Sequence, residues 1–341
     1  MDELMLNHVS RAVALYIKAS IKSDVDKMIE IEKALQSPRI ANALAGTADD
    51  FHNASVNLVK ANLYDFAVRL LDLGVRKYPR NADLYADILK YGLECRNVTD
   101  LTRYYEGDDE FCGLKNIPKR LWTWRSFSFV LDYLQELLKY YDDQNDNYIV
   151  LKKEIESLLS DFYKYAQNFN DQSEQEKAYM AESEYLLLIG ETTKAYEVLQ
   201  KAVEELSGRC PQCALRLADF YFQKADYTNT IKYATIATDS VSTQDAISVG
   251  YAFFILAISM ERKAQFIDKL TLDEKTCRPI FKAYHKAYVD LQIDNRKTLC
   301  QSVQKRVKQL EIETGIKSGI KFTDKDFDLG ALAALLDENK E

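Results

Sequence analysis

Glycine and proline are scarce in this chain, which has 11 glycines and 5 prolines among 341 residues. Together these two residue types usually make up about 12% of a protein. Apolar residues account for 47% of the sequence and charged residues for 29%, which is a globular composition. The shortage of turn-forming residues therefore favours helices joined by short connections.

The sequence also lacks an apolar run that could cross a bilayer. The longest nearly apolar run, residues 250–260, has eleven residues, whereas a membrane-spanning helix needs about 20. The first residues, Met1 to Leu4, do not show the basic and then apolar order of a secretory signal. We therefore expect a cytoplasmic protein without a membrane partner, whose six cysteines stay reduced.

Motifs for catalysis are missing as well. The sequence contains no P-loop, Gly-rich dinucleotide turn, His-Glu-x-x-His or Gly-x-Ser-x-Gly, and its three histidines lie far apart. Cys210 and Cys213 could form half of a zinc site or a redox pair, but no second Cys pair or His cluster accompanies them. We expect no catalytic residue, metal or cofactor, with Cys213 as a helix-packing residue; a redox or metal role for the two thiols stays open.

Internal repeats are present in both halves of the chain. The first repeat-like motif comprises Tyr64 to Val68, Gly74 and residues 79–81, and a similar motif follows 34 residues later. In the second half, residues 190–202 match residues 225–237 at a spacing of 35. The pattern resembles the tetratricopeptide repeat family over residues 48–106 and 176–244. That resemblance implies an all-α fold, an α-solenoid of antiparallel helix pairs that must stack on one another to bury their apolar faces. The small residues that would let paired helices approach closely are Ala67, Ala195, Ala202 and Ala237.

The rest of the chain departs from the repeat spacing but still follows a helical period. Pro118 is expected to start a helix, residues 142–147 to break it, and all five prolines to lie where helices start or stop. The predicted segments are a helical cap (1–47), repeat-like pairs (48–106), an irregular helical hairpin (107–175), further repeat-like pairs (176–270), basic helices (271–313), and a linker with an acidic amphipathic tail (314–341).

Binding residues follow from the resemblance, because the first helices of tetratricopeptide pairs line a concave face where peptides often bind. The positions that this implies are His52, Lys90, Glu94, Glu184, Leu187, Asp219, Phe222 and Phe253. They are apolar and acidic, which suits an extended or helical peptide with some basic character. The carboxylate clamp that binds chaperone tails is not matched. We expect a scaffold or adaptor that binds a protein or peptide.

Charge is divided along the carboxyl end, although the whole chain carries a net charge of −8. Residues 275–310 hold nine Lys or Arg against two acids, whereas residues 324–341 hold six acids against two lysines. The alternative function is a regulatory or nucleic-acid-associated component with a phosphate-binding face. The residues expected to contact an anionic partner are Arg278, Lys282, Lys286, Lys305 and Arg306.

The acidic tail has one apolar edge. Its members are Phe327, Leu329, Leu332, Leu335 and Leu336. We expect these side chains to dock against an apolar groove, either on the same chain or on a neighbouring copy. Docking on a neighbouring copy would make the protein a homo-oligomer through its tail.

Overall fold

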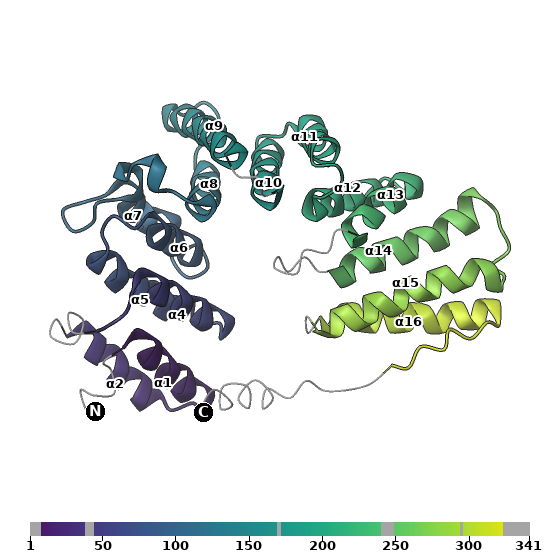
Figure 1. Cartoon of the computed structure of the whole chain (residues 1–341), viewed down its shortest axis with the longest axis horizontal. Coiled ribbons are helices and arrows are strands. Elements are labelled where there is room, and N and C mark those ends of the chain that lie inside the picture. The colour runs from purple at the N-terminus through teal and green to yellow at the C-terminus, as the bar shows by residue number, and fades with distance from the viewer. Residues whose placement is uncertain (1–7, 38–43, 169–171, 240–248, 294–295, 323–341) are drawn as a thin grey trace. The chain divides into compact units, whose positions relative to one another are not determined.

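The described part of the chain is helical. The computed structural model describes residues 8–37, 44–168, 172–239, 249–293 and 296–322. These residues form fifteen α-helices and no β-strand, which confirms the predicted all-α fold class (Figure 1).

The chain divides into two compact units, residues 1–188 and 189–341. The division falls inside the predicted repeat-like segment 176–270, between two helices. The helices of the first unit are α1 (Val9–Ile21), α2 (Val25–Gln36), α4 (Ala48–Lys60), α5 (Tyr64–Lys77), α6 (Ala82–Gly92), α7 (Thr102–Glu106), α8 (Trp124–Leu138), α9 (Asp146–Gln167) and α10 (Gln172–Leu188). Those of the second unit are α11 (Thr192–Glu205), α12 (Pro211–Gln223), α13 (Tyr227–Asp239), α14 (Val249–Arg262), α15 (Glu274–Ile293) and α16 (Lys297–Thr314).

Small residues lie at close helix contacts in both units. The four alanines singled out from the repeat pattern are all buried. Gly74 on α5 faces the ring of Phe51 on α4, and a Cβ at this glycine would lie 3.1 Å from that ring. Larger side chains at these positions would force neighbouring helices apart, because protein cores are close-packed.

Three hydrogen bonds of the first unit join residues that lie 32 to 34 positions apart. Tyr78 donates to the Gly46 carbonyl at 2.6 Å, 32 residues away, and Tyr104 donates to Asp72 at 2.8 Å, also 32 residues away. Arg76 donates to Glu110 at 2.9 Å, 34 residues away. The first of these bonds ties the end of α5 to the segment before α4, and the other two link α5 to α7 and to the loop after α7.

The region after α6 departs most from the expected repeat. Val98 and Leu101, 34 residues after Tyr64 and Ala67, are buried, but they belong to a 3-10 helix (Val98–Leu101) that is followed only by the five-residue α7. The chain then turns sharply, with positive φ at Gly107 and Gly113, whose backbones meet so closely that a Cβ at Gly113 would lie 2.3 Å from the Gly107 nitrogen. This loop leaves no room for a long second helix.

One prediction about a proline is wrong, and another is met only by a short helix. Pro118 directly precedes a 3-10 helix (Lys119–Leu121), whereas α8 begins at Trp124, where the Thr123 side chain accepts from a backbone N–H and caps the helix. Pro279 does not start α15 but lies inside it, because the helix already begins at Glu274, with Asp273 accepting from the Thr276 N–H. Pro79 lies in a turn and Pro211 is the first residue of α12, as expected; Pro38 lies outside the described residues.

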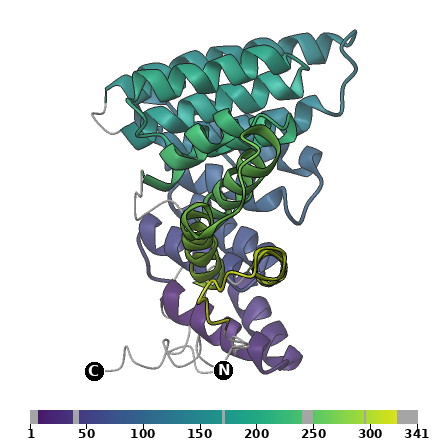
Figure 2. The same ribbon diagram turned by 90° about the vertical axis from the view of Figure 1, so that its right-hand side faces the viewer.

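The second unit ends in a helical hairpin, α15 and α16, which packs on α14. The three helices share a core that includes Ala257, Tyr284 and Val307. Inside this core Glu261 is buried, accepts from Tyr284 at 3.0 Å and binds the guanidinium of Arg306. Figures 1 and 2 show the yellow segment after α16 turning back along the hairpin.

The segment that turns back, residues 315–322, includes most of the predicted linker. Gly315 ends α16 with φ 72°, a left-handed conformation that suits glycine. Ser318 donates its backbone N–H to Glu311 at 2.7 Å, and Ile316, Ile320 and Phe322 pack against the hairpin core. Residues 315–322 are therefore part of the packed second unit.

Candidate functional site

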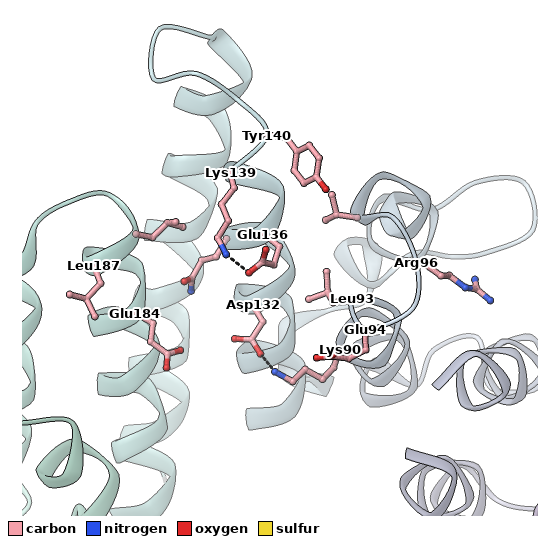
Figure 3. A pocket seen from close by; sticks show the side chains of 13 residues that line it. Lys90, Leu93, Glu94, Arg96, Asp132, Glu136, Lys139, Tyr140, Glu184 and Leu187 are labelled. Carbon is pink, nitrogen blue, oxygen red and sulfur yellow. Dashed lines mark hydrogen bonds and ion pairs between the residues drawn. The ribbon is translucent and has the colours of Figure 1, made fainter. Parts of the chain in front are cut away.

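An open cavity lies in the first unit where α6, α8 and α10 meet (Figure 3). Its volume is about 700 Å³. The residues that line it are Lys90, Leu93, Glu94, Arg96, Val98, Asp132, Gln135, Glu136, Lys139, Tyr140, Glu184, Leu187 and Leu188. We call this cavity the α6–α8–α10 groove.

Four of the eight residues predicted to bind a peptide line this groove. Lys90 lies on α6 and Glu94 in the turn after it, while Glu184 and Leu187 lie on α10. Figure 3 shows the two α10 side chains on one side of the cavity, across from Lys90. The fold thus gathers residues that are separated by more than 90 positions in the sequence.

The groove carries an excess of negative charge. Its four carboxylates outnumber its lysines, Lys90 and Lys139. The ammonium group of Lys90 lies 2.6 Å from the Asp132 carboxylate, and Lys139 pairs with Glu136. Figure 3 shows the Arg96 guanidinium pointing away from the cavity. The interior is therefore more favourable to a cation than to an anion.

A buried amide also belongs to the groove. Gln135 on α8 is only 8% exposed, and its Nε2 has no hydrogen-bond partner in the described part of the chain. A buried donor without an acceptor costs about 1 to 3 kcal/mol. No sequence pattern indicates this buried amide, because glutamine on an amphipathic helix is usually a solvated residue. The Nε2 atom is covered by its neighbours, so a ligand carbonyl in the groove would supply the missing acceptor once the amide turns toward it.

His52 does not line the groove but joins three helices by polar contacts. Its Nδ1 lies 2.7 Å from an Asp87 carboxylate oxygen, and Arg125 lies against the same ring while donating to Asp83 at 3.1 Å. Asp87 is completely buried. Burial raises the pKa of Asp87, while His52 and Arg125 act in the opposite direction. This cluster connects α4, α6 and α8.

The three remaining peptide-binding candidates lie in the second unit, where each contacts a neighbouring side chain. Asp219 on α12 accepts from Tyr251 on α14 at 2.9 Å, and burial together with this carboxylate raises the pKa of Tyr251 to about 12. The Arg262 guanidinium lies 5.2 Å from the Phe222 ring centre. The Lys286 ammonium lies 4.7 Å from the ring centre of Phe253.

The basic residues predicted to meet an anionic partner have different surroundings. Arg278, Lys282 and Lys286 are exposed on α15, and Lys305 is exposed on α16. Arg306 is only partly exposed, because it binds the buried Glu261. The tail residues Phe327, Leu329, Leu332, Leu335 and Leu336 lie outside the described residues.

Cys210 and Cys213 are both completely buried, at the start of α12. Within the described ranges, no group of three His, Cys, Asp or Glu side chains is arranged to hold a metal ion. The two thiols therefore sit where packing residues are expected.

Comparison with known proteins finds no family model and no curated protein that matches this chain. In the described part of the chain, no helix is long and apolar enough to cross a membrane.

Proposed function

We propose that this chain is an α-solenoid scaffold of tetratricopeptide-like helix pairs, and that its α6–α8–α10 groove binds a segment of another protein. The single observation that supports this most is the convergence of Lys90, Glu94, Glu184 and Leu187 on one open cavity. The resemblance to tetratricopeptide repeats independently implies these four residues as first-helix positions of a binding face. The role is non-catalytic binding.

The packing order supports the solenoid. In the first unit α4 contacts α6, α6 contacts α8, and α8 contacts α10, so first helices of successive pairs touch one another. Each also packs on its own second helix, α4 on α5 and α8 on α9. This nearest-neighbour pattern is what stacked helix pairs produce.

The chemistry of the groove favours an extended ligand segment with a basic side chain. The unsatisfied Gln135 donor needs a carbonyl oxygen. An extended peptide has free main-chain carbonyls, whereas most carbonyls of an α-helix are bonded within the helix. The acidic lining favours Lys or Arg, and the exposed Leu187 offers an apolar contact.

Selection of displayed random peptides against the full-length chain tests this proposal. The selected peptides are synthesised, and their Kd is measured for the wild type and for Gln135→Leu, Leu187→Asp and Val150→Asp. We expect peptides that contain Lys or Arg, with Kd raised at least tenfold by the first two changes. Val150 is exposed on α9 away from the groove, so its variant should bind normally.

Two results would contradict the proposal. One is a selection that yields no binding peptide. The other is a set of peptides whose affinity changes no more with the groove variants than with Val150→Asp.

A second candidate function is binding of an anionic partner such as nucleic acid. It is favoured by Arg278, Lys282 and Lys286, which are exposed at i, i+4 spacing on α15. Gel-shift titrations at about 50 and 200 mM salt decide it, because phosphate contacts give affinities that fall steeply with salt.

A further inference from the structure

The described chain ends against the surface of α15. Phe322 packs edge-on against the ring of Tyr288, with ring centres 4.9 Å apart. Ile316 and Ile320 precede it in the same packed segment. Phe322, the last described residue, therefore lies on the surface of α15, near the carboxyl end of this helix.

One face of α15 is exposed and basic. Lys275, Arg278, Lys282 and Lys286 follow one another at helical spacing, and the exposed Val289 continues the line. We call these five residues the α15 stripe. Glu274 is its acidic neighbour and pairs with Arg278, so the stripe keeps a net positive charge.

An exposed apolar cluster lies next to the amino end of this stripe. Phe266, Ile267 and Leu270, in the connection between α14 and α15, are 69%, 50% and 52% exposed. We call these three residues the apolar tip. Several large apolar side chains exposed together usually mark a contact surface. The stripe and the tip thus form a basic track with an apolar end.

Residues 323–341 have the complementary pattern. Asp324, Asp326 and Asp328 come first, and the leucines from Leu329 to Leu336 follow. We propose that residues 323–341 dock on the second unit of their own chain, with these acids on the α15 stripe and the leucines on the apolar tip.

The distances allow this contact. From Tyr288 back to Glu274 the helix rises about 21 Å, at about 1.5 Å per residue. Nine extended residues, 323–331, span up to about 30 Å. Leu332 can therefore reach the apolar tip while the three aspartates pass the lysines of α15.

The tether favours this segment over other occupants of the surface. A short covalent connection gives an effective concentration in the millimolar range. Nucleic acid would use the basic stripe but gain little from the apolar tip. An anionic membrane would use both, but it would first have to displace the attached segment.

A charge-swap series in the full-length chain tests the docking through amide hydrogen exchange of residues 323–341. Lys282→Glu with Lys286→Glu is expected to speed exchange there at least fivefold. Adding Asp324→Lys, Asp326→Lys and Asp328→Lys should restore slow exchange. The control, Lys305→Glu with Lys308→Glu, makes the same charge change on α16 and should have no effect.

A disulfide test locates the leucines. In a chain with Cys95→Ser and Cys112→Ser, the pair Ile267→Cys and Leu332→Cys is expected to cross-link within one molecule. Ile312 is 84% exposed on α16, so Ile312→Cys with Leu332→Cys is the matched control and should cross-link at least tenfold more slowly.

Four outcomes overturn the proposal. The first is that residues 323–341 of the wild type exchange their amides as fast as a free peptide. The second is that the charge swap does not restore the lost protection. The third is that Leu332→Cys cross-links equally fast to Ile267→Cys and Ile312→Cys, and the fourth is that cross-links form only between two molecules. Equal binding of phosphatidylserine vesicles, or of duplex DNA, by the full chain and by a chain ending at residue 322 would also show that the surface is uncovered.

Discussion

The imidazole of His52 lies 2.7 Å from the carboxylate of Asp87, a residue 35 positions further along the chain and completely buried. The contact joins α4 to α6 across the intervening helix α5. Its removal should loosen α4 from α6.

We expect Asp87→Ala to lower the free energy of unfolding by about 1 to 3 kcal/mol, because Arg125 and His52 would lose a buried partner. Urea denaturation followed by circular dichroism measures the change. Asp142 is exposed in a loop, so Asp142→Ala is the control. Equal effects of the two changes would mean that the buried contact contributes no stability.

Replacing Gln135 by leucine should stabilise the protein by about 1 kcal/mol while it weakens ligand binding. The change removes a buried donor without an acceptor and keeps similar volume. A higher Tm in a thermal melt is the expected result. A lower Tm would indicate that the amide already has a partner, such as an ordered water, in the unbound protein.

Arg306→Met is expected to destabilise the second unit by about 3 kcal/mol, because Glu261 would stay buried without its cation. Adding Glu261→Gln should recover most of the loss, since a neutral amide can still accept from Tyr284. Arg278→Met changes an exposed position on α15 and should alter the free energy of unfolding by less than about 0.5 kcal/mol. A double variant no more stable than Arg306→Met alone would argue against the charge explanation.

Asp219 should make stability depend on pH. Burial raises the pKa of this carboxyl in the folded protein, so the folded state holds the proton more tightly than the unfolded chain. Its stabilising contribution is present below about pH 4, the usual value for aspartic acid, and is lost as pH rises through the folded pKa. Asp219→Asn keeps an acceptor for Tyr251 and should lose less stability than wild type between pH 4 and 7. Glu204→Gln, at an exposed position, should follow the wild-type curve; if Asp219→Asn does so too, the carboxyl is not perturbed.

Helix periodicity and small buried residues were predictable from the sequence, because both depend on local spacing. The four buried alanines and the helical character of the repeat-like segments illustrate this. Pro279 was misplaced because proline is common in a first helical turn, whereas here the capping Asp273 starts the helix earlier. Local propensity alone could not show which of the two residues sets the boundary.

The groove was predictable only in part. The resemblance to tetratricopeptide repeats predicted Lys90 and Glu184 as neighbours of one binding surface, and both line the same cavity, but it did not predict which side chains would find partners. His52 was placed on the correct helix, yet its burial against Asp87 depends on the packing of three helices. The missing acceptor of Gln135 is likewise a property of all its neighbours together.

The similar sequence intervals of hydrogen bonds in the first unit bear on how this unit folds. Hydrogen bonds such as Tyr78 to Gly46 and Tyr104 to Asp72 each close a loop of 32 residues. Loop-closure entropy depends on the logarithm of loop length, so each added pair meets nearly the same entropic barrier. Contacts of such short range give a low contact order, which is associated with fast folding. Unfolding should accordingly proceed pair by pair, with an outer pair such as α1–α2 able to open while the α4–α6 region keeps its protection from exchange.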